Sequence, residues 1–359
     1  MSILDLARPE IRGLQAYSSA RTEAAMAEVM LNANESAWPP AGVPMPLHGR
    51  SLNRYPDPQP RDLLARLAEL YSVDESRILM GRGSDEAIDL LIRAFRRPGM
   101  DAIAIAPPTF GMYSVCAAIQ GAKCIQVPLD RRFELDVDVL LEKLPASLKV
   151  VFLCSPNNPT GGLISHASIG RIATALHERA LVIVDEAYIE FANAPSATVL
   201  LGRHENLGIL RTLSKAWGLA GARVGCLLAD SEVISLLRRI MPPYPLPTPS
   251  IVAALAALNA EGLELTRQRI GLVVSERERL AAALVRLPSV VEVLPSQANF
   301  LCVRFDDAAR VQRSLQRDGV IVRDVGRHPR LEGYLRITVG SREENSRLLE
   351  ALVRQEVSG

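Results

Sequence analysis

Between about residue 60 and residue 240, the sequence alternates amphipathic helical stretches with short runs of apolar residues. Residues 60–71, which open with a proline, and residues 84–97 both have the helical pattern. The apolar runs lie at residues 102–106, 149–155, 181–186, 207–213 and 223–229. Because strands that are covered on both faces are apolar throughout, this pattern predicts an α/β fold with a mainly parallel central sheet and helices on both of its faces.

A proline-rich segment at residues 241–249 separates this region from the C-terminal part of the chain. An Ala/Leu-rich helical stretch then runs from Ile251 toward Leu287. Strand patterns follow near 299–305, 320–323 and 334–339, with helical patterns around 307–318 and 341–355. A chain of 359 residues is long enough for two domains. We therefore predict an N-terminal arm that packs on the rest of the chain or on a partner subunit, a large domain and a smaller α/β domain, over residues 1–30, 31–243 and 244–359.

Charge balance and cysteine usage exclude several classes of protein. The chain has 41 basic and 40 acidic residues, so it lacks the basic excess that nucleic-acid binding requires. Its five cysteines are scattered without a C-x-x-C pair, which indicates free thiols in a reducing compartment. The five histidines show no metal-ligand spacing, so no metal site is expected. With no signal-peptide pattern and no run of roughly 18 apolar residues, we expect a cytoplasmic protein.

Lysine is rare in this sequence, and its rarity singles out one position. Only four of the 41 basic residues are lysines, and Lys215 is the only lysine in the second half of the chain. Arginine supplies the other surface cations, but its guanidinium does not deprotonate to attack a carbonyl, whereas a lysine amine does. Lys215 is therefore a candidate amine nucleophile, although a lysine that extends from a strand end toward solvent would give the same pattern.

Polar clusters follow four of the apolar runs, at residues 107–113, 155–162, 185–188 and 211–223. Ligands of open parallel sheets bind beyond the carboxyl ends of the strands. The four clusters are therefore expected to meet at one edge of the sheet, which the packing of a core does not predict.

Taken singly, these polar groups have ordinary explanations as well. Residues 81–86 open a helix with two glycines, which suits an anion but equally suits an ordinary helix start. They match neither the dinucleotide-binding fingerprint nor the P-loop. Asp185 could simply cap the turn after its strand, and Asn157 could serve its turn alone.

Taken together, the motifs resemble the fold-type I pyridoxal-phosphate aminotransferases, and within them the histidinol-phosphate branch. The likeness extends over nearly the whole chain, and the order and spacing of the motifs carry it. The motifs are residues 31–36, 53–60, 81–95, 107–115, 151–162, 182–191, 211–225, 244–249, 298–305 and 335–345.

The resemblance implies a covalently held pyridoxal 5′-phosphate and roles for four residues in its chemistry. Lys215 would hold the cofactor as a Schiff base and later move a proton. Asp185 would pair with the pyridinium nitrogen and keep the ring protonated, so that it accepts electrons. Asn157 and Tyr188 would donate hydrogen bonds to the phenolic oxygen of the cofactor.

The resemblance also implies how the cofactor is held in place. Phe110 would stack on the ring, at a position where related enzymes often have tyrosine. Tyr55 would reach the phosphate of a neighbouring subunit, so that each site of a homodimer needs both chains. The remaining phosphate contacts would come from Ser84, Asp85, Thr212, Ser214 and Arg223.

For the substrates, the resemblance implies Arg336 as the residue that binds an α-carboxylate, with Asn157 beside it. Arg323 would add a second cation for a phosphate ester, and Tyr17 in the arm would be a further phosphate contact. Both arginines lie in strand patterns, where they could by themselves face solvent or line a site. The implied reaction is amino transfer between L-histidinol phosphate and 2-oxoglutarate, which gives imidazole acetol phosphate and L-glutamate, in histidine biosynthesis.

Three alternatives remain at this point. An aminotransferase for aromatic amino acids and a threonine-phosphate decarboxylase would use the same scaffold. A cofactor-binding module without catalytic activity would retain the same motifs without turnover.

Overall fold

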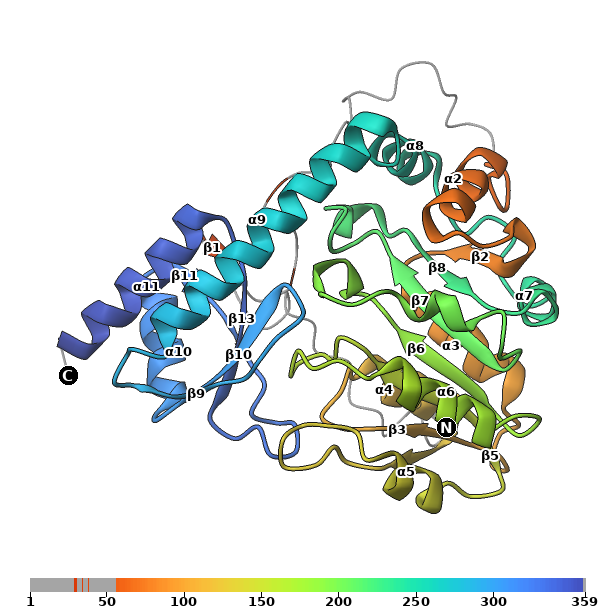
Figure 1. Cartoon of the computed structure of the whole chain (residues 1–359), viewed down its shortest axis with the longest axis horizontal. Helices are drawn as coiled ribbons and strands as arrows, with labels where there is room; N and C mark the ends of the chain where they lie inside the picture. Colours follow the sequence, from red (N-terminus) through yellow and green to blue (C-terminus); the bar gives the residue numbers. More distant parts are fainter. Residues whose placement is uncertain (1–28, 31–33, 35–37, 39–55, 358–359) are drawn as a thin grey trace, which may run out of the picture.

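The computed structural model, which describes residues 29–30, 34, 38 and 56–357, contains two large β-sheets of different kinds (Figure 1). The first has seven strands in the order β2-β8-β7-β6-β5-β3-β4. Tyr17, Tyr55 and most of the expected arm lie outside the described residues. The strands of the first sheet are β2 (Ile78–Gly81), β3 (Ala102–Ile105), β4 (Lys123–Gln126), β5 (Leu148–Cys154), β6 (Leu181–Asp185), β7 (Leu207–Thr212) and β8 (Gly225–Leu228).

The mainly parallel sheet expected from the sequence is confirmed. Strands β7, β6, β5, β3 and β4 are parallel neighbours, whereas β8 is antiparallel to both β7 and β2. The β7–β8 connection, residues 213–224, carries only the short helix η5 (Ala220–Ala222) and begins with a hydrogen bond from the Leu213 N–H to the Val224 carbonyl, 2.9 Å. Since a parallel return needs a crossover that spans the sheet, this connection brings β8 back in the opposite direction.

Helices cover both faces of this sheet, and two separate apolar clusters form beneath them. One face packs against α2 (Arg61–Tyr71), α5 (Val137–Lys143), α6 (His166–Ala175) and α8 (Thr248–Ala257). The other packs against α3 (Ser84–Phe95), α4 (Met112–Ile119) and α7 (Ser231–Arg238). Further 3₁₀ helices lie in the connections, namely η2 (Glu75–Arg77), η3 (Ile189–Phe191) and η4 (Ala197–Leu200).

The alternation of side chains along β6 decides which groups reach each face. Val182 and Val184 pack in the cluster under α2, α5, α6 and α8, whereas Ile183 packs under α3, α4 and α7. Because side chains alternate along a strand, Asp185 lies on the α3 side and Glu186 on the α2 side. Asp185 and Glu186, although consecutive, therefore belong to two different polar clusters on opposite faces of the sheet.

The second sheet has the order β12-β13-β10-β9, and every neighbouring pair is antiparallel. Three helices cover one of its faces: α9 (Ala260–Leu284), α10 (Ala308–Arg317) and α11 (Arg342–Val357). Leu335 and Ile337 of β13 pack beneath these helices, so Arg336 and Thr338 extend from the opposite face. The strands are β9 (Val290–Val293), β10 (Phe300–Phe305), β12 (Arg323–Asp324) and β13 (Tyr334–Thr338), and a separate parallel pair joins β1 (Val29–Met30) to β11 (Val320–Ile321).

The helical stretch expected from Ile251 toward Leu287 is two helices, α8 and α9. The Asn259 side chain caps the second helix by accepting a hydrogen bond from the Gly262 N–H, 2.7 Å. Helix α8 follows the expected domain boundary at residue 244, yet its Ile251 and Ala254 belong to the core of the seven-stranded sheet. Helix α9 extends from α8 to the smaller sheet (Figure 1). We therefore propose that the large domain extends to α8 and that α9 joins the two domains.

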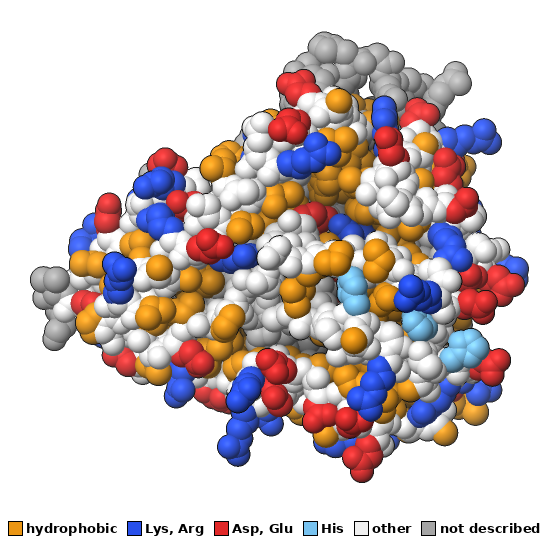
Figure 2. All heavy atoms as spheres, in the orientation of Figure 1, with side chains coloured by type: hydrophobic (Ala, Val, Ile, Leu, Met, Phe, Trp, Pro, Cys, Tyr) orange, Lys and Arg blue, Asp and Glu red, His pale blue; other side chains and the backbone are white. Residues whose placement is uncertain are grey.

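On the face shown in Figure 2, basic and acidic side chains are interspersed, in keeping with the near balance of charges in the sequence. Within the described part of the chain, no helix combines the length and the apolar character that a membrane crossing requires.

Candidate functional site

A cavity of about 110 Å³ lies at the carboxyl edge of the parallel strands. Residues from the ends of β5, β6 and β7, from the start of α3 and from the connecting loops line it. All of them except Cys154, Asn158 and Ala187 are residues singled out from the sequence. The lining residues are Ser84, Asp85, Phe110, Cys154, Asn158, Asp185, Ala187, Tyr188, Thr212, Ser214, Lys215 and Arg223.

Asp185, the last residue of β6, is the buried acid of this cavity, with 2% of its surface exposed. The Tyr113 hydroxyl donates a hydrogen bond to its Oδ2, 2.7 Å, and the Ala187 N–H donates to its Oδ1, 3.1 Å. Burial raises the pKa of Asp185 to about 6, although these two hydrogen bonds oppose the shift. Both donors are neutral, so a cation placed beside the carboxylate would stabilise its ionised form. A protonated ring nitrogen is such a cation.

Tyr113 was not singled out from the sequence, although it lies only three residues after Phe110. Its side chain is fully buried, stacks on Phe152 at 4.9 Å between centroids and meets Phe110 edge to face at 5.5 Å. Phe110 lies just before α4 and Tyr113 lies in its first turn, so the closeness of the two aromatic residues in the sequence is the signal that could have linked Tyr113 to the site.

Lys215 lies in the β7–β8 connection and lines the cavity. Its Nζ is 5.8 Å from the centre of the Tyr188 ring. Thr212 and Ser214 precede it at the end of β7, and the Ser214 N–H donates to the Thr212 Oγ1, 3.1 Å. The amine and two hydroxyls therefore reach the cavity from one tight turn.

The start of helix α3 forms the other wall. Its N-cap residue Gly83 has a φ of 78° and provides no side-chain cap for the first N–H groups. A Cβ at Gly225 on β8 would lie 2.6 Å from the Ser84 nitrogen, so only glycine allows this close approach of β8 to α3. Uncapped N–H groups at a helix start bind anions, and phosphate fits this position.

Arg223 completes this wall from the end of the β7–β8 connection. Its Nη2 lies 3.2 Å from the Asp85 Oδ2, and its Nη1 donates to the Ser214 Oγ, 3.4 Å. Burial raises the pKa of the Asp85 carboxyl, while Arg223 and Lys215 lower it. Because the two side chains of the ion pair are 48% and 41% exposed, the pair itself contributes little to stability. Arg223 is thus positioned to bind a phosphate group beside the α3 start.

Arg336 reaches the site from the smaller sheet. Its Nη1 donates to the Asn158 Oδ1, 2.6 Å, and its guanidinium carbon lies 5.4 Å from the centre of the Phe300 ring. Arg323 on β12 pairs directly with Arg336 in the antiparallel register, so both side chains leave the same face of the sheet. Two like charges at directly opposed positions are unfavourable. An anionic ligand would relieve this repulsion.

Asn157 is not where the sequence analysis expected it. Its Nδ2 donates to the Pro108 carbonyl, 2.9 Å, and to the Thr160 Oγ1, 2.7 Å, while its Oδ1 accepts from the Thr109 hydroxyl, 3.0 Å. These contacts tie two loops together and leave Asn157 outside the cavity wall. Asn158 lines the cavity instead and donates to the Tyr188 hydroxyl oxygen, 3.3 Å. The structure thus places Asn158 and not Asn157 on the cavity wall, because the direction of each side chain within the turn is not evident from the sequence.

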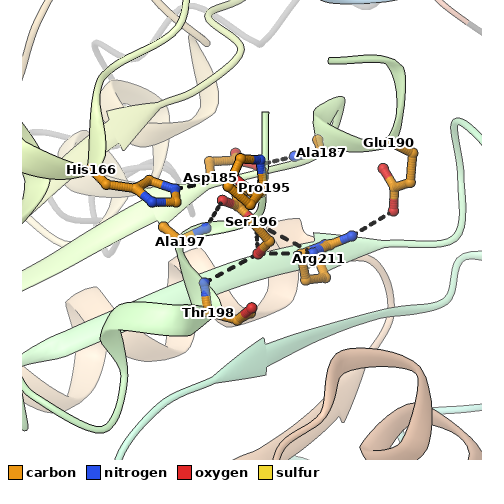
Figure 3. A network of polar contacts seen from close by, with 10 residues as sticks. His166, Asp185, Ala187, Glu190, Pro195, Ser196, Ala197, Thr198 and Arg211 are labelled. Atoms are coloured by element: carbon orange, nitrogen blue, oxygen red, sulfur yellow. Dashed lines mark hydrogen bonds and ion pairs between the residues drawn. The ribbon is translucent and has the colours of Figure 1, made fainter. Parts of the chain in front are cut away.

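On the opposite face of the sheet lies a second polar group, which we call the Arg211 cluster: Glu186, Glu190, Ser196 and Arg211. Figure 3 shows Glu190, Ser196 and Arg211 of this cluster. The Arg211 Nη1 lies 3.3 Å from the Glu186 Oε2, and its Nη2 lies 2.7 Å from the Glu190 Oε1. The Ser196 hydroxyl also donates to Glu186. The guanidinium carbon lies 4.5 Å from the centre of the Tyr71 ring. Both carboxylates thus have a cation of the chain itself as their partner, which indicates a structural role.

All five cysteines are free thiols. Within the residues that the structure describes, no group of three or more histidine, cysteine, aspartate or glutamate side chains is placed to hold a metal ion.

The chain is similar to known proteins in sequence and in fold. The family model for aminotransferase class I and II matches residues 16–352. The histidinol-phosphate aminotransferase of Xanthomonas axonopodis pv. citri (strain 306) is 52% identical over 357 residues, which cover 98% of this chain and 97% of that protein. The enzyme of the same name from Stenotrophomonas maltophilia (strain R551-3) is 50% identical over 354 residues, which cover 98% and 96%.

The same fold occurs in the crystal structure of histidinol-phosphate aminotransferase from Sinorhizobium meliloti in complex with pyridoxal-5′-phosphate. The TM-score is 0.84 at 24% identity, and the match covers 98% of this chain and 97% of that one.

Proposed function

The chain belongs to the class I and II aminotransferases, which depend on pyridoxal 5′-phosphate, and on that basis we propose that it transfers the amino group between L-histidinol phosphate and 2-oxoglutarate. The products would be imidazole acetol phosphate and L-glutamate, in the biosynthesis of L-histidine. The observation that carries the proposal is the arrangement of one amine, one buried carboxylate and one anion-binding helix start around a single cavity, with two paired arginines on the neighbouring sheet. The proposal is also supported by the 50–52% identity of the chain to relatives named histidinol-phosphate aminotransferase.

The cavity residues fit the cofactor. Lys215 would hold the cofactor covalently, and Asp185 would face its ring nitrogen. Because the Asp185 carboxylate is buried, a nearby cation would stabilise its ionised form. Phe110 would lie against the ring. The phosphate would be bound by Ser84 and by the backbone N–H of Asp85 at the start of α3, together with Thr212, Ser214 and Arg223. When bound, the cofactor supplies an electron sink for cleavage of a bond at the substrate α-carbon.

The chain's own groups would then bind, orient and move protons. Asp185 would keep the ring nitrogen protonated, because the ionised carboxylate is costly to bury without a nearby cation. The Lys215 amine would carry the proton to and from the substrate α-carbon. Tyr188 would donate its hydroxyl proton toward the cofactor, while its own oxygen accepts from Asn158.

The paired arginines would bind the two substrates in turn. Arg336 would bind the α-carboxylate of glutamate, with Asn158 beside it. Arg323 would add the second positive charge that a phosphate ester needs. This pairing of charges favours histidinol phosphate over an amino donor without a phosphate.

A homodimer with shared sites and a cytoplasmic location belong to the same proposal. Tyr55 would contact the cofactor phosphate of the other subunit, and Tyr17 would contact the substrate phosphate. Both tyrosines lie outside the described residues. Light scattering of the purified chain tests the dimer.

The test is a steady-state comparison of histidinol phosphate, phenylalanine and threonine phosphate as substrates. We expect histidinol phosphate to give the highest kcat/KM by more than about tenfold, which corresponds to about 1.4 kcal/mol in transition-state binding. An equally large preference for phenylalanine would make the chain an aromatic aminotransferase. Release of carbon dioxide from threonine phosphate without a keto acid would make it a decarboxylase, and cofactor binding without any turnover would leave only a binding module.

A further inference from the structure

We propose that Asn34, which is held by the small-domain residues Thr338 and Asn299, is a positioning residue for Tyr188 and orients it so that the Tyr188 hydroxyl proton points into the cavity. The inference rests on the proposed function only in taking the cavity as the cofactor site. No step of it depends on which amino donor the enzyme prefers.

Asn34 is fully buried and hydrogen-bonded through every polar group it has. Its N–H donates to the Thr338 Oγ1, 3.0 Å, and the Thr338 hydroxyl donates back to the Asn34 Oδ1, 2.8 Å. Its carbonyl accepts from the Asn299 Nδ2, 3.1 Å. Its φ of 52° lies in the left-handed region, which asparagine tolerates better than most residues. These contacts hold Asn34 rigidly against the small domain.

The remaining group, the Asn34 Nδ2, donates to the Tyr188 hydroxyl oxygen, 3.4 Å. Tyr188 belongs to the large domain, just before η3, whereas Thr338 lies two residues after Arg336 on β13. Residues two apart on a strand share a face. Asn34 therefore links the strand that carries the substrate-binding arginine to the tyrosine of the cofactor cavity.

The network also determines which way both amides point. Arg336 donates to the Asn158 Oδ1, so the Nδ2 of Asn158 must be the group that faces Tyr188. Thr338 accepts from the Asn34 N–H, so its hydroxyl proton is available for the Asn34 Oδ1, and the Nδ2 again faces Tyr188. Each assignment follows from donors whose direction is settled by their chemistry.

Two amide donors thus converge on one phenol oxygen. A phenol oxygen has two acceptor positions and one proton to donate. With both acceptor positions taken by Asn34 and Asn158, the Tyr188 proton is left for a third partner on the cavity side, where the side chain lines the wall. With the cofactor bound, an anionic oxygen of the cofactor would be this third partner.

The test combines Asn34→Ala, Tyr188→Phe and the double variant in a thermodynamic cycle on the holoenzyme. The first readout is the pH titration of the cofactor absorbance at its Lys215 linkage. The second is the single-turnover rate with L-glutamate. We expect Asn34→Ala to shift the titration in the same direction as Tyr188→Phe and to lower the glutamate rate about 3- to 10-fold, the scale of one lost hydrogen bond. Neither effect should increase further when Tyr188 is already phenylalanine.

Two further variants separate positioning from stability. Asn34→Asp keeps the size and the acceptor for Thr338 but removes the donor to Tyr188, so it should reproduce the spectral shift even where Asn34→Ala folds poorly. Asn206→Ala is the matched control, because Asn206 is a buried asparagine whose Nδ2 donates only to the Ala173 and Ala180 carbonyls among the described residues. It should lower the thermal midpoint and leave the absorbance titration unchanged.

The proposal is overturned if the Asn34 variants lower the midpoint and leave the titration unchanged, or if their effect persists undiminished in the Tyr188→Phe background. Neither readout uses histidinol phosphate. A wrong substrate assignment would therefore leave the titration unaffected, and the two proposals fail separately.

Discussion

Two buried charged regions lie back to back across strands β6 and β7, and they handle charge in opposite ways. In the Arg211 cluster, one guanidinium meets two carboxylates at 3.3 and 2.7 Å. Burial alone would lower the pKa of Arg211, but Glu190 and Glu186 outweigh it, and the pKa is raised. In the cavity, Asp185 is buried to a similar degree but accepts hydrogen bonds from the neutral groups of Tyr113 and Ala187, and its pKa rises to about 6.

The difference shows how the fold separates charged groups that stabilise the structure from charged groups that face the ligand cavity. Asp185 and Glu186 are consecutive, yet strand alternation sends them to opposite faces. The carboxylate whose partner is built into the chain stabilises the loop that carries Tyr188. Asp185, whose hydrogen-bond donors among the described residues are the neutral groups of Tyr113 and Ala187, faces the cavity, where a cationic ligand would neutralise it. Changes in the cavity should therefore alter chemistry, and changes in the Arg211 cluster should alter stability.

The largest expected effect is on activity, from Lys215→Ala. Loss of the amine should lower kcat/KM by about 10⁴-fold or more, because no other group replaces a covalent nucleophile and proton carrier. Borohydride reduction followed by peptide mass spectrometry should find the cofactor on Lys215 in the wild-type enzyme and on no residue of the variant. Lys143→Ala, at an exposed lysine, is the control and should behave as wild type. A label on another residue would refute the assignment.

The next largest effect is on stability, from Arg211→Met. This change leaves two buried carboxylates without their cation and should lower the free energy of unfolding by about 3–5 kcal/mol. Urea denaturation of the apoenzyme measures it. Arg66→Met removes a pair whose side chains are 54% and 76% exposed, and it should cost less than about 1 kcal/mol. Equal losses for the two variants would show that the Arg211 cluster does not support the fold.

In the apoenzyme, Asp185→Asn should raise the free energy of unfolding at high pH, whereas Arg211→Met should lower it. The pKa of this carboxyl is about 6 in the folded chain against an ordinary 3.8, so the folded state binds more protons than the unfolded state between these values. The contribution of this carboxyl to the free energy of unfolding should therefore be full below pH 3.8 and should fall as the pH rises. Above pH 6 the contribution should be lower by about 3 kcal/mol.

Asparagine does not ionise, so the apo Asp185→Asn variant should be more stable than the wild-type apoenzyme at pH 8. The variant should also bind the cofactor more weakly than wild type. Urea midpoints at pH 5 and pH 8, together with a cofactor titration, check both. If the variant is less stable than wild type at pH 8, then the carboxylate is already compensated and the contrast with Arg211 is lost.

The smallest effect separates two neighbours in one turn. Asn158→Ala should weaken transition-state binding, as measured by kcat/KM, by roughly 1–2 kcal/mol, because it removes hydrogen bonds to Tyr188 and Arg336. Asn157→Ala should instead lower the free energy of unfolding by about 1–3 kcal/mol, since it breaks the contacts to Pro108 and Thr160. Kinetics and urea unfolding on both variants distinguish the two, and the reverse pattern would restore Asn157 as the site residue.

Much of the site could be predicted from the sequence because its chemistry depends on residue type and on strand order. Lys215 stands out in a chain with only four lysines, and Asp185 directly ends an apolar run. Parallel strands place their carboxyl ends at one edge. These facts are local or topological, and the cavity gathers the residues they indicate. Tyr113 and Asn34 were missed because their roles depend on contacts with residues far away in the chain.

The sequence by itself determined the α/β class and the parallel core of the large sheet, and it singled out Lys215 as the candidate amine, because apolar periodicity and rare residue types are readable without contacts. Only the tertiary structure decided that Asn158 and not Asn157 lines the cavity, that Glu186 pairs with Arg211, and that α8 packs with the large domain. The physical reason is that a side chain's partner depends on which distant element packs beside it. Neighbours in sequence experience nearly the same local preferences, yet one turn or one step along a strand places them in different surroundings.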